Sequence, residues 1–260
     1  MSTIRLADHD GGVRVLTLDR PPANALDESL LADLVAALDT ARDDASVRAL
    51  VVTGAGPFFS AGFDLAAPRR DAAASDALRT LYRDSHLRLL TFPKPTLALL
   101  AGHAVAGGLV LVLACDYRLG AEGDYKIGLN EVAIGASFPR IALEIVRLRL
   151  SHARAAELLL GAAVYPASQA TRLGVVDELL PAETLTETVL RRATRMGSLP
   201  REAYAHTKAA LVEDAVRRAM AEPPEADARA AAVWTTAESR TARARQRDKI
   251  GKGPRSHGAG

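Results

Sequence analysis

Three short segments of the 260-residue chain combine glycines with polar residues in an order that could support catalysis. Residues 59–65 read Phe-Ser-Ala-Gly-Phe-Asp-Leu, residues 102–108 read Gly-His-Ala-Val-Ala-Gly-Gly, and residues 127–132 read Ile-Gly-Leu-Asn-Glu-Val. The first two segments each follow an apolar run typical of a strand, and the second also opens an apolar run typical of a helix. A glycine pair at such a junction brings backbone N–H groups close to a ligand and directs a helix N-terminus at it.

Two N–H groups from separate loops could converge on one oxygen atom and form an oxyanion hole. Glu131, in the third segment, is a carboxylate among apolar neighbours. Partial burial would raise the pKa of Glu131 and suit it to proton transfer. Each segment alone is also compatible with an ordinary turn or a surface glutamate, so the interpretation depends on their combination.

The elements that must position these segments alternate between strand and helix in the first half of the chain. Asp27 is a candidate N-cap for a helix that closes by residue 46. We expect a loop at residues 58–67 and a helix at residues 76–90. The apolar runs predicted as strands are residues 13–18, 49–53 and 96–100, and the run at 107–113 is predicted as a helix. This short alternation predicts an α/β layer architecture.

The second half of the chain is mostly helical in pattern, with one short strand at residues 175–180. Helices are predicted at residues 141–150, 151–160, 168–173 and 184–196. From Pro200 onward the pattern predicts helix or tail, broken at Pro223, with one long segment at 225–250. Basic side chains gather in residues 240–255, which fits a solvated helix face and tail, or an end that contacts phosphates or another subunit.

Composition indicates a globular protein and excludes several other classes. Hydrophobic residues make up 48% and charged residues 25%, close to the globular average. The formal charge of +2 and the 4% aromatic content do not favour nucleic-acid binding. Cys115 is the single cysteine, which predicts a reducing, cytoplasmic setting. The sequence contains no Cys/His cluster that would suggest a metal site. It also contains no run of about 18 apolar residues that would suggest a membrane span.

Taken together, the motifs over about residues 10–195 resemble the crotonase superfamily, also called the enoyl-CoA hydratase/isomerase family. The resemblance rests on Ser60-Ala-Gly-Phe-Asp64, on Ala106-Gly-Gly108 with Cys115-Asp-Tyr117, and on later matches at 158–161 and 170–177. It implies a spiral of strand-strand-helix units over residues 1–195. It also implies a helical region at 196–260 for oligomerisation and active-site cover, assembly into homotrimers or homohexamers, and an acyl-CoA thioester substrate. No separate cofactor is expected, because coenzyme A is part of the substrate.

The resemblance also implies roles for particular residues. Glu131 would be the catalytic acid and base, and the Gly107 N–H would be one oxyanion donor. The second donor would come from the first loop, with Phe63 favoured and Ala61 left open. Lys249 is a candidate contact for the CoA phosphates. The remaining residues expected near CoA are Ser60, Ala61, Gly62, Asp64 and Gly108.

One departure from the family's hydratase pattern bears on the reaction. Hydratases use two glutamates, and the position of the first is occupied here by Val110. Moving a double bond requires only one base, which takes a proton from carbon 2 and returns it to carbon 4. The sequence therefore predicts a Δ3,Δ2-enoyl-CoA isomerase. The alternatives are a hydratase, a decarboxylase or a thioester hydrolase with one glutamate, or a catalytically silent member that binds acyl-CoA or RNA.

Other polar residues near the motifs are interpreted as structural. His103 would lie near a strand end, Asp116 and Arg118 would anchor the strand that follows the apolar helix, and Cys115 would be a core residue. Asp177 is predicted at a turn or an interface. Ser137 and Phe138 replace a glycine-rich stretch of the hydratases, which suggests an altered acyl pocket.

Overall fold

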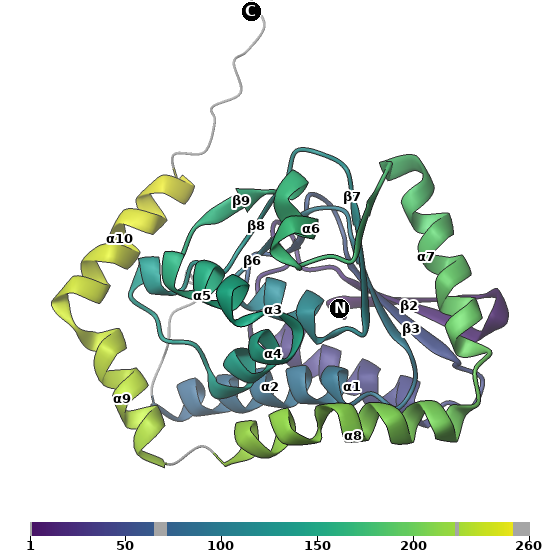
Figure 1. Cartoon of the computed structure of the whole chain (residues 1–260). Coiled ribbons are helices and arrows are strands. Elements are labelled where there is room, and N and C mark those ends of the chain that lie inside the picture. The colour runs from purple at the N-terminus through teal and green to yellow at the C-terminus, as the bar shows by residue number, and fades with distance from the viewer. Residues whose placement is uncertain (1, 65–71, 222–223, 252–260) are drawn as a thin grey trace, which may run out of the picture.

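The computed structural model describes residues 2–64, 72–221 and 224–251. The strands form two sheets, and helices pack around them (Figure 1). The larger sheet has the order β1-β2-β3-β5-β7-β10. Neighbouring strands in it are parallel except β1, which pairs antiparallel with β2. Its strands are β1 (Ile4–His9), β2 (Val13–Leu18), β3 (Ala49–Gly54), β5 (Thr96–Leu100), β7 (Tyr117–Ala121) and β10 (Glu178–Leu180).

The smaller sheet has the order β4-β6-β8-β9 and is built from strands of three residues each. Strands β4, β6 and β8 are mutually parallel, and β9 closes the sheet antiparallel to β8. The four strands are β4 (Phe58–Ser60), β6 (His103–Val105), β8 (Lys126–Gly128) and β9 (Val164–Pro166).

The chain visits the two sheets alternately, which produces a spiral. Strand β3 is followed by β4 and helix α2 (Ala72–Leu90), β5 by β6 and α3 (Gly107–Ala114), and β7 by β8 and α4 (Arg140–Arg149). Each turn of the spiral thus contributes one strand to each sheet and one helix. The predicted α/β fold with strand-strand-helix units is confirmed.

Helices flank the larger sheet and complete the core. Helix α1 (Glu28–Asp43) begins at Asp27, whose side chain accepts a hydrogen bond from Leu30 N, as predicted. Helix α1 packs along α2, while α7 (Ala182–Gly197) contacts β2, β3, β5 and β7 (Figure 1). Every residue of α3 is buried, because this helix packs against β4 and β6 of the smaller sheet and against helices α2 and α4.

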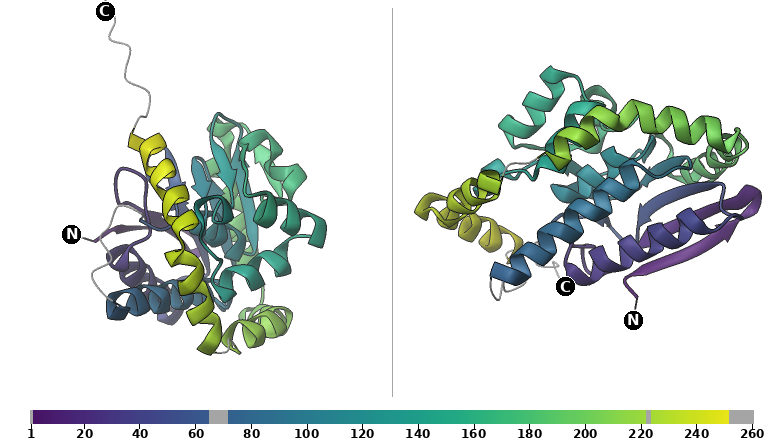
Figure 2. Two further views of the ribbon diagram at one scale, coloured as in Figure 1. Left: turned by 90° about the vertical axis from the view of Figure 1, so that its left-hand side faces the viewer. Right: turned by 90° about the horizontal axis from the view of Figure 1, so that it is seen from below.

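The C-terminal helices run along the outside of the spiral (Figure 2). Helix α8 (Arg201–Met220) packs against α4, and α10 (Ala237–Gly251) packs against α9 (Pro224–Thr235) and the short 3-10 helix η2 (Val132–Ile134). The remaining short elements are η1 (Asp10–Gly12), α5 (His152–Gly161), η3 (Ala167–Gln169) and α6 (Ala170–Leu173). Among the helices within the described ranges, none combines the length and apolar character needed to cross a membrane.

Several expectations about elements were wrong or incomplete. Residues 58–60 are strand β4 rather than part of a loop, and strands β1, β6, β8 and β9 were not predicted. The segment 225–250 is two helices rather than one, because Thr236 Oγ1 accepts a hydrogen bond from Ser239 N at 3.1 Å and starts α10. Residues 65–67 of the predicted loop and residues 252–255 of the basic segment lie outside the described residues.

Candidate active site

The three motif segments meet at one edge of the smaller sheet. Each segment contains the end of one strand, β4, β6 or β8, and continues beyond it. These strands are adjacent and parallel, so their carboxyl ends lie at the same edge. Ligands of α/β proteins bind outside the carboxyl ends of such strands. The segments are also bonded or packed together, since Ala106 N donates to Gly128 O at 2.8 Å. The combination inferred from the sequence is therefore brought together in space.

The first loop is held in place by its own hydrogen bonds. The Ser60 hydroxyl donates to Asn24 O at 2.7 Å and accepts from Gly62 N at 3.2 Å. Leu26 N then donates to Gly62 O at 2.8 Å, and Asp64 N donates to Leu26 O at 3.1 Å. The buried Ser60 side chain thus supports the loop from inside.

These bonds separate the two candidate N–H donors of the first loop. Ala61 N already donates to Ala23 O at 3.0 Å. Phe63 lies between the two bonds that the loop makes with Leu26, so its own N–H faces the opposite side. Within the described residues, Phe63 N has no acceptor, and the geometry favours Phe63 over Ala61 as a donor to a ligand.

Gly107 begins α3, and the first N–H groups of a helix have no acceptor within it. Ala106, its N-cap, has φ 52° and ψ −132°, a conformation that L residues rarely adopt and that orients the Gly107 peptide. The first loop lies against this helix start, because a Cβ on Gly62 would be 3.0 Å from Gly107 N. A Cβ on Gly108 would be only 2.3 Å from Ser60 O, so glycine is needed there for close packing.

Glu131 precedes η2 and is the buried carboxyl group of this site. It is 8% exposed, and its Oε2 atom has no hydrogen-bond partner among the described residues. Burial raises the pKa of Glu131 from 4.5 to about 8. A carboxyl group with a pKa near neutrality can both accept and return a proton at physiological pH.

Two residues of α2 that the sequence analysis did not single out lie beside these groups. Tyr82 and His86 are both buried, and the Tyr82 ring stacks on Phe63 and on His86. Burial raises the pKa of Tyr82, and the charge of Glu131 raises it further. Two aromatic rings at i and i+4 on the apolar face of the predicted helix were the available signal.

The other predicted CoA contacts have structural partners as well. The Asp64 carboxylate lies 2.9 Å from Arg20 Nη2, in an ion pair that links the first loop to the segment before α1.

Val110, at the position of the missing glutamate, is fully buried in α3. Phe138 is partly buried against the core, and the side chain of Lys249 lies outside what the structure describes.

The polar residues interpreted as structural do make structural contacts. His103 Nδ1 accepts a hydrogen bond from Lys126 N at 2.9 Å, and Arg118 is paired with Asp177 at 2.5 Å. Cys115 is buried. Asp116 holds the start of β5 by accepting from Thr96 N at 3.0 Å, and it binds Lys208 of α8 at 2.7 Å.

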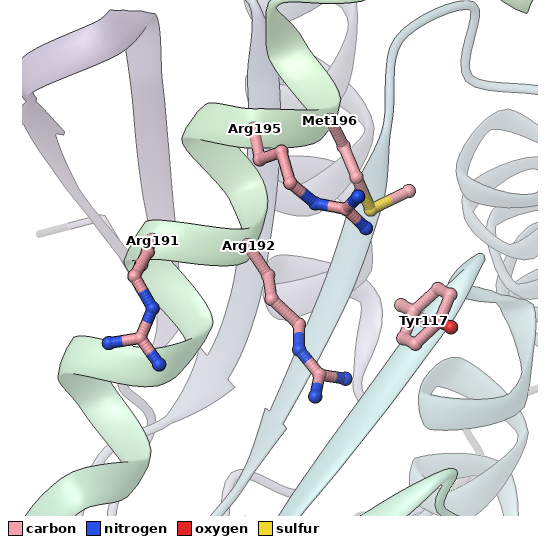
Figure 3. Close-up of a pocket in the computed structure, with 5 residues that line it drawn as sticks. All are labelled: Tyr117, Arg191, Arg192, Arg195 and Met196. Carbon is pink, nitrogen blue, oxygen red and sulfur yellow. The ribbon is translucent and has the colours of Figure 1, made fainter.

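A pocket of about 400 Å³ lies elsewhere, between α7 and β7 (Figure 3). None of the predicted site residues lines it; its walls are Tyr117, Arg191, Arg192, Arg195 and Met196. Arg192 is paired with Glu178 and lies over the Tyr117 ring. The candidate site is therefore defined by the convergence of backbone donors and Glu131, not by this pocket.

Similarity to known proteins shows the family of the chain. The sequence pattern of the enoyl-CoA hydratase/isomerase family matches residues 8–247. The chain belongs to this family. The resemblance to the crotonase superfamily inferred from the motifs is thereby confirmed, and the chain is an enzyme of the hydratase/isomerase family.

Relatives within the family carry both names. A protein of Mycobacterium avium named probable enoyl-CoA hydratase is 33% identical over 206 residues, covering 78% of this chain and 79% of that protein. Human mitochondrial enoyl-CoA delta isomerase 1 is 31% identical over 211 residues, covering 78% of this chain and 68% of that protein. The crystal structure of human mitochondrial Δ3-Δ2-enoyl-CoA isomerase has a TM-score of 0.87 and 27% identity, covering 96% of this chain and 100% of that one.

Proposed function

We propose that the protein is an enoyl-CoA isomerase that moves a double bond of an unsaturated acyl-CoA from position 3 to position 2. The observation that carries this proposal has two parts. Glu131 is buried with one carboxyl oxygen, Oε2, that has no hydrogen-bond partner among the described residues, and a fully buried valine occupies position 110. Hydration needs a water molecule to be activated as well as a proton to be delivered. Isomerisation needs only one group that moves one proton.

In the proposed reaction, the thioester oxygen accepts hydrogen bonds from Phe63 N–H and Gly107 N–H. Glu131 removes a proton from carbon 2, and the electrons delocalise toward the thioester oxygen as a dienolate. The same carboxyl group then delivers the proton to carbon 4, which leaves the double bond between carbons 2 and 3. The two N–H groups stabilise the charge that develops on oxygen, and such donors are each worth about 100- to 1000-fold in rate.

The first loop supports the proposed binding of coenzyme A. Backbone groups of Ser60, Ala61, Gly62 and Asp64 lie beside the proposed oxyanion donors, and Gly108 permits the loop to approach α3. Helix α10 packs against η2, directly after Glu131, and a Cβ on Gly135 would lie 2.5 Å from Ser239 Cα. This contact supports residues 196–260 as the cover of the site. Assembly into trimers or hexamers stays a prediction.

The direct test is to supply a series of 3-enoyl-CoA thioesters and follow the ultraviolet absorbance of the conjugated 2-enoyl product. We expect kcat/KM of the wild-type protein to rise with pH and level off above about 8, because Glu131 must be ionised to accept a proton. Failure to isomerise any chain length would refute the assignment. A pH profile without a rise in this range would mean that Glu131 is not the base that removes the proton.

Hydration is the second candidate, since several relatives are named as hydratases. Its test uses a 2-enoyl-CoA, whose conjugated absorbance disappears as water adds and 3-hydroxyacyl-CoA forms. If 3-hydroxyacyl-CoA forms at a rate comparable with isomerisation, the protein is a hydratase despite Val110.

A further inference from the structure

Helix α2 places a stack of three rings between the first loop and the start of α3. The ring centroids of Phe63 and Tyr82 are 4.7 Å apart, and those of Tyr82 and His86 are 3.9 Å apart. Both pairs have an interplanar angle of 28°. Tyr82 is 1% exposed and His86 is fully buried, so the stack is enclosed at its α2 end.

The stack also contacts the backbone of Gly107. A Cβ on Gly107 would lie 2.9 Å from Tyr82 Cε2 and 3.3 Å from the Tyr82 hydroxyl, so the ring touches this residue. His86 Nδ1 lies 2.8 Å from Tyr82 O, and its Nε2 lies 3.4 Å from Gly107 O. One end of the stack is therefore Phe63. The other end is His86, which lies beside the carbonyl oxygen of Gly107.

His86 is suited to this place because it stays uncharged. Burial lowers its pKa from 6.5 to about 4, so at neutral pH the ring carries one N–H. A neutral ring can hydrogen-bond to only one of its two neighbouring carbonyls at a time. It adds no positive charge that would stabilise the ionised form of Glu131.

We propose that Phe63, Tyr82 and His86 form a positioning stack that fixes the two oxyanion donors relative to each other. The inference rests on the proposed use of Phe63 N–H and Gly107 N–H as donors. Leu26 holds the backbone on either side of Phe63 through Gly62 O and Asp64 N, and the ring of Phe63 adds a side-chain contact that links this loop to Tyr82 of α2. Donors of an oxyanion hole must be held to within a fraction of an ångström, because a misplacement of about 1 Å can cost about 100-fold in rate.

The test measures oxyanion alignment without relying on isomerisation. A conjugated aromatic 2-enoyl-CoA absorbs in the ultraviolet, and hydrogen bonds to its thioester oxygen shift that absorption to longer wavelength. We expect the shift on binding to wild type and to Tyr82→Phe, which keeps the ring. We expect Tyr82→Leu to lose most of the shift, with kcat lowered about 10- to 100-fold and KM within about 3-fold.

Two further variants keep the test informative if Tyr82→Leu folds poorly. Phe63→Leu removes the ring at the loop end, where the side chain is only partly buried, and should also reduce the shift and kcat. Phe92→Leu changes a buried aromatic residue outside the stack and should lower stability while leaving the shift and kcat in place.

The outcomes separate this inference from the proposed function. An intact shift in both Tyr82→Leu and Phe63→Leu would overturn the positioning stack. Loss of the shift in Tyr82→Phe would also overturn it, because the hydroxyl rather than the ring would then act. If wild type binds the thioester without any shift, the oxyanion assignment fails and the inference fails with it. A normal shift in a protein that does not isomerise would refute the isomerase assignment alone.

Discussion

Two buried glutamates show what distinguishes a reactive carboxyl group from a structural one in this protein. Glu144 is fully buried on α4, and its carboxylate lies 3.3 Å from Arg140, 2.9 Å from Arg147 and 2.7 Å from Arg218. Glu131 is nearly as buried, but one of its oxygens has no partner among the described residues. Burial is common to both residues, so the difference lies in compensation of the charge.

The surroundings of each residue explain the difference. Glu144 is flanked at i−4 and i+3 by arginines of its own helix, and α8 supplies Arg218 from outside. Glu131 follows a three-residue strand and leads into η2, where no helical neighbour of opposite charge stands beside it. A buried carboxyl group without a cation has a strongly shifted pKa, and such groups are concentrated in functional sites.

The largest expected effect concerns activity and comes from Glu131→Gln. The amide has nearly the same shape but cannot accept and return a proton, so kcat for isomerisation should fall by about 1000-fold, within the usual range for a general acid–base group. Steady-state kinetics with a 3-enoyl-CoA measures it, and circular dichroism checks the fold. Full activity in this variant would remove Glu131 from the mechanism.

The same variant should change how stability depends on pH. Below about pH 4.5 Glu131 is protonated in both the folded and unfolded chain, and between 4.5 and about 8 only the unfolded chain releases its proton. Wild type therefore loses stability as the pH rises through this window, and the loss is complete above about 8. Glu131→Gln avoids this loss, so its advantage should grow to a few kcal/mol at pH 9 and vanish near pH 4.

Thermal or urea unfolding of the two proteins across that pH range gives the comparison directly. When the free energies of unfolding of the two proteins are subtracted at each pH, the contributions of all other titrating groups cancel. A stability difference that does not vary with pH would mean that burial does not raise the pKa of Glu131.

The smallest expected effect on activity comes from Glu144→Gln. Removing the negative charge weakens the hydrogen bonds from Arg147 and Arg218 and the ion pair with Arg140. These guanidinium groups are partly solvated, so stability should fall by about 2 kcal/mol. We expect kcat to stay within about 2-fold of wild type. If Glu144→Gln lowers kcat as much as Glu131→Gln does, Glu144 is not a purely structural residue, and the contrast between the two glutamates fails.

Local patterns in the sequence were sufficient for the longer elements. The apolar runs of β3 and β5, the Asp27 cap of α1 and the periodic face of α2 all follow from propensity and periodicity. Strand β1 was missed because only Ile4 is buried in it, and its extended state comes from pairing with β2. The strands β4, β6 and β8 are too short to show a period.

What the sequence by itself determined is the list of groups that could react: glycines after two strands, one glutamate in an apolar segment, and valine at position 110. Tertiary structure decided which of them can act together. Whether Ala61 or Phe63 offers a free N–H depends on Ala23, which is distant along the chain. The stack of Tyr82 and His86 on Phe63 depends on how α2 packs against the first loop. Periodicity reports local conformation and burial, whereas partners for N–H groups and charges come from whichever elements the fold brings alongside.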